Sequence, residues 1–269
     1  MLGLYDSGIG GLTILQEILK TNPDLDIIYL ADNANLPLGE KTLDQIQDIV
    51  QKAVEKLFDL GCDLVILACN TATVNTIRYM QQVWLPESKW ANSHRVLGIG
   101  QPLLEILEER KTDYADKKGL VLATHTTYKS GFYQSEIKQR GFHDLPVLPC
   151  FGLAGAIESF DEKIISKSLE NIFNQPKAGL KEIEFIVLGC THYKWAIESI
   201  QKYFSQKIKV IDNSEDVALR LKTYLERHPQ FKSNTGKLKF YLTQSDSIGK
   251  YNSILEQKLE LSCKFEIIA

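Results

Sequence analysis

Residues 64–71 read Leu-Val-Ile-Leu-Ala-Cys-Asn-Thr, and residues 185–192 read Phe-Ile-Val-Leu-Gly-Cys-Thr-His. Each stretch is a short apolar run followed by a small residue, a cysteine and polar residues that can begin a helix. A continuous apolar run of this length is typical of a strand buried on both faces, as in a parallel sheet covered by helices. The two stretches therefore predict an α/β fold in which Cys69 and Cys190 follow equivalent strands.

Short apolar runs alternate with helical patterns along the rest of the chain. The predicted strands are 2–5, 27–31, 64–68, 96–99, 120–123, 146–148, 185–188, 209–211, 238–242 and 265–268. Between them, apolar residues recur at helical spacing, for example in 12–19, in 43–57, and in 215–227, where the apolar residues are Val217, Leu219, Leu221 and Leu225. Strands separated by helices predict mostly parallel sheets flanked by helices.

The composition is that of an ordinary globular protein. The chain has 269 residues, a formal net charge of -3 and five cysteines. This charge argues against the broad basic surface of a nucleic-acid-binding protein, and no apolar run approaches the roughly 18 residues that span a bilayer. The first residues lack the basic and apolar regions of a signal peptide. An odd number of cysteines without a C-x-x-C motif predicts free thiols, so we expect a cytoplasmic protein.

Polar side chains follow four of the predicted strands. They are Asp6 and Ser7; Cys69, Asn70 and Thr71; Thr124 and Thr127; and Cys190, Thr191 and His192. Ligands of parallel α/β sheets bind at these carboxyl ends, so a site is expected there. The glycine-rich turn at 8–11 lacks the spacing of a nucleotide-binding loop. It predicts a tight strand-to-helix turn, with Asp6 or Ser7 as the helix cap and with Asp6 placed to orient an amine or a thiol.

The paired cysteines leave three chemistries open. An unperturbed thiol is only about 3% thiolate at pH 7, so either cysteine needs activation, which helix-start amides or an imidazolium supply. A Cys/His/acid hydrolase would leave one cysteine idle. A zinc site could use Cys69, Cys190 and His192, but the spacing of a local ligand cluster is missing. Proton transfer by two opposed thiols uses both, with Asp6 or Asn70 beside one and His192 beside the other.

Together these motifs resemble the cofactor-independent glutamate racemases of the aspartate/glutamate racemase superfamily. The matching blocks are residues 6–11, Asp32, 37–41, 68–72, Thr124 with Thr127 and Ser130, Glu158, 189–193 and 213–214. They occur in the family's order over almost the whole chain.

The resemblance implies two similar α/β domains with the active site in the cleft between them. The domains would be residues 1–97 plus 210–269 and residues 98–209. The reaction implied is interconversion of L- and D-glutamate without a cofactor or metal, which supplies D-glutamate for peptidoglycan synthesis. The expected partner is this small-molecule substrate, with neither nucleic acid nor membrane, and a homodimer is one possible assembly.

The resemblance also implies roles for individual residues. Cys69 would take the Cα proton of D-glutamate and Cys190 that of L-glutamate. Asp6 would support Cys69, while His192, helped by Glu158, would support Cys190. The substrate would be held by Asp6, Ser7, Pro37, Leu38, Gly39, Asn70, Thr71, Thr124, Thr127, Thr191 and His192.

Four sites depart from the family's pattern, and one of them is a pair of residues. Asn35 stands where the family usually has Arg, Leu38 where it has Tyr, Gln101 where Glu is common, and Lys194-Trp195 where Pro-Leu is usual. If position 38 acts through its backbone N–H, glutamate remains the expected substrate. If the Tyr side chain contributes to binding, aspartate or another small acid becomes the alternative. A non-catalytic, two-lobed amino-acid-binding protein is the contrasting hypothesis.

Overall fold

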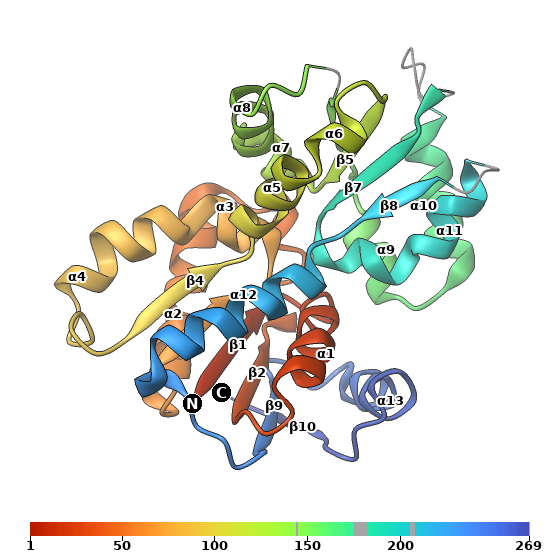
Figure 1. The fold of residues 1–269 in the computed structure, drawn as a ribbon. Coiled ribbons are helices and arrows are strands. Elements are labelled where there is room, and N and C mark those ends of the chain that lie inside the picture. The colour runs from red at the N-terminus through yellow and green to blue at the C-terminus, as the bar shows by residue number, and fades with distance from the viewer. Residues whose placement is uncertain (144, 175–181, 205–207, 269) are drawn as a thin grey trace.

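The computed structural model describes residues 1–143, 145–174, 182–204 and 208–268, which form two parallel sheets (Figure 1). The strands are β1 (Leu2–Asp6), β2 (Ile27–Ala31), β3 (Leu64–Leu67), β4 (Arg95–Gly98), β5 (Gly119–Ala123), β6 (Val147–Pro149), β7 (Phe185–Gly189), β8 (Lys209–Ile211), β9 (Leu238–Leu242) and β10 (Phe265–Ile267). Each predicted strand is found within one residue of its expected ends. The predicted α/β class with parallel sheets is confirmed.

The two sheets divide the strands unequally. The larger sheet has the order β10-β9-β2-β1-β3-β4, and the smaller has the order β6-β5-β7-β8. All pairings described are parallel, and β1, β3, β5 and β7 are buried along their whole length. The apolar character of these strands follows from that burial, because helices cover both faces of a parallel sheet.

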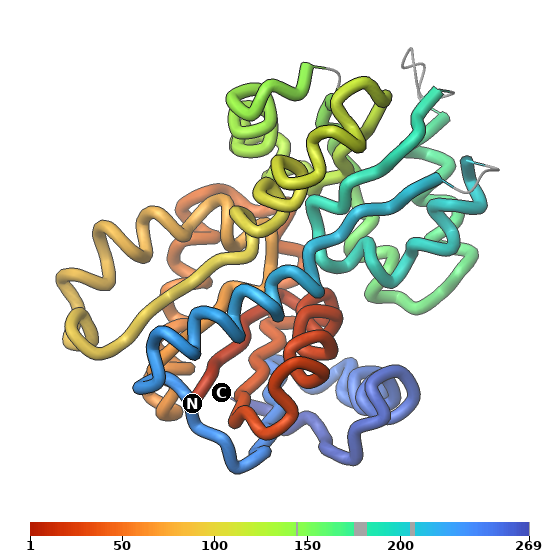
Figure 2. The backbone as a smooth tube through the Cα atoms, viewed as in Figure 1, coloured from red at the N-terminus to blue at the C-terminus, as the bar shows by residue number. Residues whose placement is uncertain are grey.

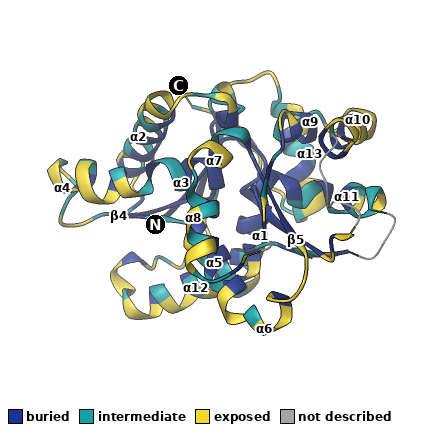
Figure 3. Cartoon of the chain, turned by 90° about the horizontal axis from the view of Figure 1, so that it is seen from above, coloured by how far each residue is buried: buried dark blue, intermediate teal, exposed yellow. Residues whose placement is uncertain are grey.

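Helices surround both sheets, with their outer faces exposed and the strands buried beneath them (Figure 3). They are α1 (Leu12–Thr21), α2 (Leu43–Asp59), α3 (Asn70–Tyr79), α4 (Leu85–Glu87), α5 (Gly100–Glu109), α6 (Lys111–Tyr114), α7 (His125–Lys129), α8 (Phe132–Gln139), α9 (Leu153–Glu158), α10 (Glu162–Phe173), α11 (Ile197–Tyr203), α12 (Ser214–Arg227) and α13 (Ile248–Leu259). Val217, Leu221 and Leu225 of α12 are buried as expected. Leu219 is instead 49% exposed, because residues two apart lie on different helix faces.

The chain passes between the sheets twice, after β4 into α5 and after β8 into α12 (Figure 2). The two crossings are tied together by the Asn213 side chain, whose Nδ2 donates to the Ile99 carbonyl oxygen at 2.7 Å. The predicted division into residues 1–97 plus 210–269 and residues 98–209 stays a proposal, with one change. Strand β8 pairs with β7 up to Ile211, so we propose that the second domain ends after Ile211 instead of after residue 209.

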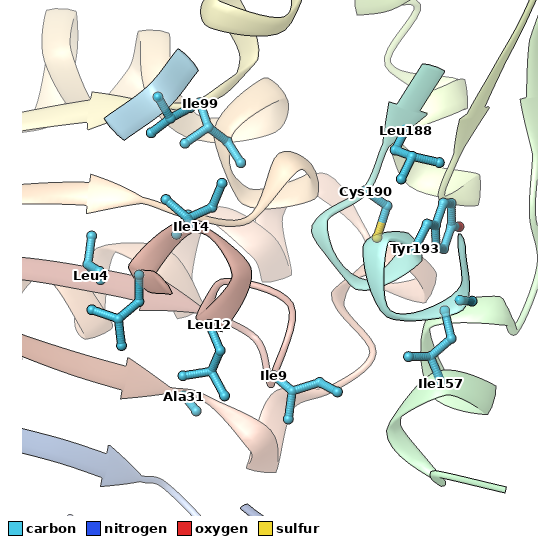
Figure 4. Packing of buried hydrophobic residues seen from close by; sticks show 14 of the residues in the cluster. Leu4, Ile9, Leu12, Ile14, Ala31, Ile99, Ile157, Leu188, Cys190 and Tyr193 are labelled. Carbon is cyan, nitrogen blue, oxygen red and sulfur yellow. The ribbon is translucent and has the colours of Figure 1, made fainter. Parts of the chain in front are cut away.

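The hydrophobic core is continuous between the sheets. One cluster of buried residues includes Leu4 and Ala31 from the larger sheet and Leu188 and Tyr193 from the smaller sheet and the segment after it. Figure 4 shows part of this cluster, with Ile9 on the turn after β1 and Cys190 and Tyr193 on the segment after β7. This packing holds the carboxyl ends of β1 and β7 next to each other.

Candidate active site

The ends of the central strands of both sheets meet at one place. The Thr191 hydroxyl, just after β7, donates to Asp6 Oδ2 at the end of β1 at 3.2 Å. Cys69 directly precedes α3, and Cys190 directly precedes the 3-10 helix Thr191–Ala196. Each cysteine therefore stands where the backbone N–H groups of a helical segment begin.

Both cysteines line one cavity. Its lining comprises Ser7, Leu36, Pro37, Leu38, Gly39, Glu40, Cys69, Thr71, Thr124, His125, Cys150, Phe151, Gly152, Ala154, Gly155, Cys190 and His192. The enclosed free space is about 20 Å³, which is room for about one water molecule. Of the predicted site residues, Asp6, Asn70, Thr127, Glu158 and Thr191 do not line the cavity but lie behind it. The predicted site residues therefore form two layers, one that lines the cavity and one directly behind it.

Cys190 lies beside a buried acid–base relay. Its Sγ is 4.0 Å from His192 Nδ1, and His192 Nε2 is 2.8 Å from Glu158 Oε1. Burial alone would lower the pKa of His192, but its hydrogen bonds with Cys190 and Glu158 and the charge of Asp6 raise that pKa well above the ordinary value. The raised pKa favours the imidazolium form of His192, and an imidazolium is the kind of neighbour that stabilises a thiolate.

The Glu158 carboxylate is itself held by two further donors. The Ile9 backbone N–H donates to Oε1 at 2.8 Å, and the Tyr251 hydroxyl donates to Oε2 at 3.1 Å. Glu158 thus links the turn after β1, helix α13 and His192. A carboxylate fixed in this way orients the imidazole and keeps it charged.

Cys69 has a different environment. Its Sγ is 3.9 Å from Ser7 Oγ. Burial, and then the negative charge of Asp6, raise the pKa of the Cys69 thiol, which favours its protonated form. Burial also raises the pKa of Asp6 to about 6, although the charge of His192 and the N–H of Gly8 partly oppose this. The two thiols therefore have different neighbours, a serine hydroxyl and a carboxylate for Cys69 and a histidine for Cys190.

The glycine-rich turn after β1 allows close approach of the supporting groups. A Cβ atom at Gly8 would lie 1.8 Å from Glu158 Oε1, and one at Gly10 would lie 2.5 Å from Thr191 Oγ1. The prediction that Asp6 or Ser7 caps the next helix is wrong. Asp6 accepts from the N–H of Gly8 within the turn, Ser7 lies beside Cys69, and α1 begins after Gly11 without a side-chain cap.

Three threonine hydroxyls form a cluster at the opposite wall. Thr71 Oγ1 is 2.9 Å from Thr124 Oγ1, which in turn is 3.0 Å from Thr127 Oγ1. Thr124 also caps α7 by accepting from the N–H of Thr127. A Cβ atom at Gly39 would lie 2.7 Å from Thr124, so this glycine lets the 37–40 segment pack against the cluster. The wall thus carries hydroxyl and backbone donors suited to a carboxylate.

Comparison with known proteins identifies the family of the chain. The model of the Asp/Glu/Hydantoin racemase family matches residues 12–215. The chain belongs to this family. It is 38% identical to the glutamate racemase of Paracoccus denitrificans over 91% of this chain and 92% of that protein, and 36% identical to that of Roseobacter denitrificans over 97% and 98%. The chain is an isomerase of the glutamate racemase type.

Solved glutamate racemases have the same fold. The RacE1 isoform from Bacillus anthracis superposes with a TM-score of 0.81 at 25% identity, covering 100% of this chain and 97% of that one. The enzyme from Francisella tularensis, solved in complex with D-glutamate, gives a TM-score of 0.80 at 26% identity with coverages of 100% and 97%. None of the helices in the described ranges is long and apolar enough to cross a bilayer.

The four departures from the racemase pattern have local structural partners. Asn35 donates to both Asp32 carboxylate oxygens at 3.0 Å, and Leu38 is a buried part of the cavity wall. The indole N–H of Trp195 donates to the Ile9 carbonyl oxygen at 3.2 Å and so fixes the turn that holds Glu158. Lys194 Nζ donates to Asp212 Oδ1 at 3.0 Å, and the Arg140 guanidinium donates to Gln101 Oε1 at 3.4 Å.

Several residues of this racemase site were not predicted. His125, Cys150 and Phe151 line the cavity. Cys150 follows β6, so the strand-end rule that singled out Cys69 would also have found it. Tyr133 and Tyr251 reach supporting residues from α8 and α13, for which no sequence signal exists because such contacts depend on packing. No group of three metal-ligating side chains occurs among residues 1–143, 145–174, 182–204 and 208–268.

Proposed function

We propose that this racemase interconverts L- and D-glutamate by passing protons between Cα and two thiols, Cys69 and Cys190. The observation that carries the proposal is that the two cysteines, from different sheets, line one cavity and have separate acid–base partners. A hydrolase would leave one of these cysteines without a role. Two positioned thiols supply what inversion requires, a base on one face of the carbon and an acid on the other.

The two environments set the starting protonation for the L-to-D direction. The Cys190 thiolate, stabilised by the His192 imidazolium, takes the Cα proton of L-glutamate. The thiol of Cys69 gives its proton to the opposite face, which produces D-glutamate. Cys190 is then a thiol and Cys69 a thiolate, the state from which D-glutamate is converted in the reverse direction.

The carbanion formed by proton removal spreads its charge into the substrate's carboxylate, so donors must stabilise it. The hydroxyls of Thr71 and Thr124 and the backbone N–H groups at Leu38 and Gly39 lie on the cavity wall and can serve in this way. Positioned acids and bases contribute about 10²–10⁴-fold, so this stabilisation is needed in addition to the thiols.

The cavity must open to admit a substrate. Its free space of about 20 Å³ holds about one water molecule, far less than an amino acid requires. We infer that the two proposed domains separate for entry and close for reaction, which also excludes water. The hinge of this motion would lie at the two segments that cross between the sheets, which the hydrogen bond from Asn213 to Ile99 joins.

We favour glutamate over aspartate because the relatives from Paracoccus denitrificans and Roseobacter denitrificans, at 38% and 36% identity, are glutamate racemases. The Francisella racemase, at 26% identity, was solved with D-glutamate. On the family resemblance we also infer that the product supplies peptidoglycan synthesis in the cytoplasm. The homodimer remains a prediction.

Two substitutions test the mechanism. Cys69→Ser and Cys190→Ser should each lower racemisation of glutamate by about 10²-fold or more, since a serine hydroxyl is a far weaker acid than a thiol. Cys62→Ser is the matched control, because Cys62 is buried behind the larger sheet and does not line the cavity. Optical rotation and deuterium incorporation at Cα in D₂O are the measurements.

The outcomes separate the hypotheses. Full activity in either cysteine variant would overturn the two-thiol scheme. Tight binding of glutamate by the wild-type chain, without inversion or deuterium uptake, would instead favour an amino-acid-binding protein. Faster turnover of aspartate than of glutamate would reassign the substrate but leave the proton transfer intact.

A further inference from the structure

The side chain of Asn70 has one satisfied end and one unsatisfied end. Its Nδ2 donates to the Tyr133 hydroxyl oxygen at 2.8 Å, whereas its Oδ1 is buried and has no hydrogen-bond partner among the described residues. Asn70 is only 1% exposed and stands between Cys69 and Thr71, which both line the cavity. Buried polar atoms are nearly always paired, so the free end of this amide indicates a partner that enters the site.

Tyr133 reaches Asn70 from the other side of the site. It lies on α8, which packs on the smaller sheet, and its side chain is 1% exposed. Its ring edge would lie 3.1 Å from a Cβ atom at Gly189, the residue before Cys190. Tyr133 therefore lies against Gly189, which precedes Cys190, and binds the Asn70 amide, which follows Cys69. It does not line the cavity, so it acts through its neighbours.

We propose that Tyr133 is a positioning residue that directs the Asn70 amide toward the carboxylate of the substrate; this inference rests on the proposed function. A carboxylate only accepts hydrogen bonds, so it needs the N–H end of the amide. In the structure that end is occupied by Tyr133 and the oxygen is free, the reverse of what the substrate requires.

A half-turn of the amide resolves this mismatch without moving either residue. The two ends of a side-chain amide have nearly the same shape, and a tyrosine hydroxyl both donates and accepts. After the turn, the Tyr133 hydroxyl donates to Asn70 Oδ1, and Nδ2 donates to the carboxylate. Every buried polar atom of the pair is then satisfied. A phenylalanine at position 133 would remove the donor that holds this orientation.

The test is a double-mutant cycle of Tyr133→Phe and Asn70→Ala. Tyr133→Phe should raise KM for glutamate and lower kcat/KM by about 10-fold or more, as expected for loss of a hydrogen bond to a charged group. Tyr114→Phe is the matched control, because the Tyr114 hydroxyl is also buried on the smaller sheet but has no partner among the described residues. The control should keep the wild-type kcat/KM, and both tyrosine variants should keep a melting temperature close to that of the wild type.

The cycle distinguishes positioning from general packing. If Tyr133 acts through Asn70, the double variant is no slower than Asn70→Ala alone. Multiplying losses, or an unchanged KM in Tyr133→Phe, would overturn the inference. A wild-type chain without racemisation would refute the proposed function, and the same cycle measured in the Kd for glutamate would then decide the role of Tyr133.

Discussion

The buried carboxylate of Asp6 should make the stability of the protein depend on pH. Burial raises its pKa from the ordinary value of 3.8 to about 6. A carboxyl group with a higher pKa when folded binds its proton more tightly in the folded chain. Its contribution to stability is therefore complete below the unfolded pKa and is lost as pH rises through the folded pKa.

The size of the effect follows from this difference. One pKa unit corresponds to about 1.4 kcal/mol, so ionising Asp6 costs the folded chain about 3 kcal/mol by about pH 7.5. About 1 kcal/mol of this stability is already lost at about pH 4.5, so about 2 kcal/mol is lost between about pH 4.5 and about pH 7.5. Asn is the appropriate replacement because it mimics the neutral carboxyl. Its amide oxygen can accept from the N–H of Gly8, and its amide N–H can donate to the Thr191 hydroxyl, which itself donates to Asp6 in the wild type.

The assay is urea unfolding of the wild type and Asp6→Asn at several pH values between about 4.5 and 7.5. The variant should gain about 2 kcal/mol in free energy of unfolding relative to the wild type across this range. Asp48→Asn removes the same charge from an exposed residue paired with Lys52 and is the control, with a nearly constant difference. Parallel curves for Asp6→Asn and the wild type would refute the argument that burial raises the pKa of Asp6.

Two other predictions concern the glycine-rich turn and the thiols. A methyl group at Gly8 would displace the Glu158 carboxylate from His192, so Gly8→Ala should lower kcat/KM by about 10- to 100-fold. The control Gly249→Ala, whose methyl group would lie in open space on α13, should leave activity unchanged. Equal activity in the two variants would contradict this reasoning. Burial raises the pKa of Cys62 to about 12, so a charged thiol reagent near pH 8 should label the half-buried Cys263 before the buried Cys62. Mass spectrometry of the modified chain measures the order, and prompt labelling of Cys62 would count against its burial.

The strands and their ends were predictable because the signals for them are local. A run such as residues 185–188 is apolar because both faces of β7 are covered, and that requirement is written into consecutive residues. The rule that ligands bind beyond the carboxyl ends of parallel strands then placed Cys69, Thr124 and Cys190 near one site. All three line the same cavity.

The sequence alone therefore determined the α/β class, the strand positions and part of the cavity lining, including Cys69, Thr124 and Cys190. The tertiary structure decided which further groups support them: Tyr251 behind Glu158, and Tyr133 behind Asn70. It also showed that Gly8 is needed for close approach to Glu158, a residue 150 positions away in the chain. The physical reason is that burial and periodicity act on neighbouring residues, whereas a hydrogen bond between distant side chains exists only once the elements that carry them have packed together.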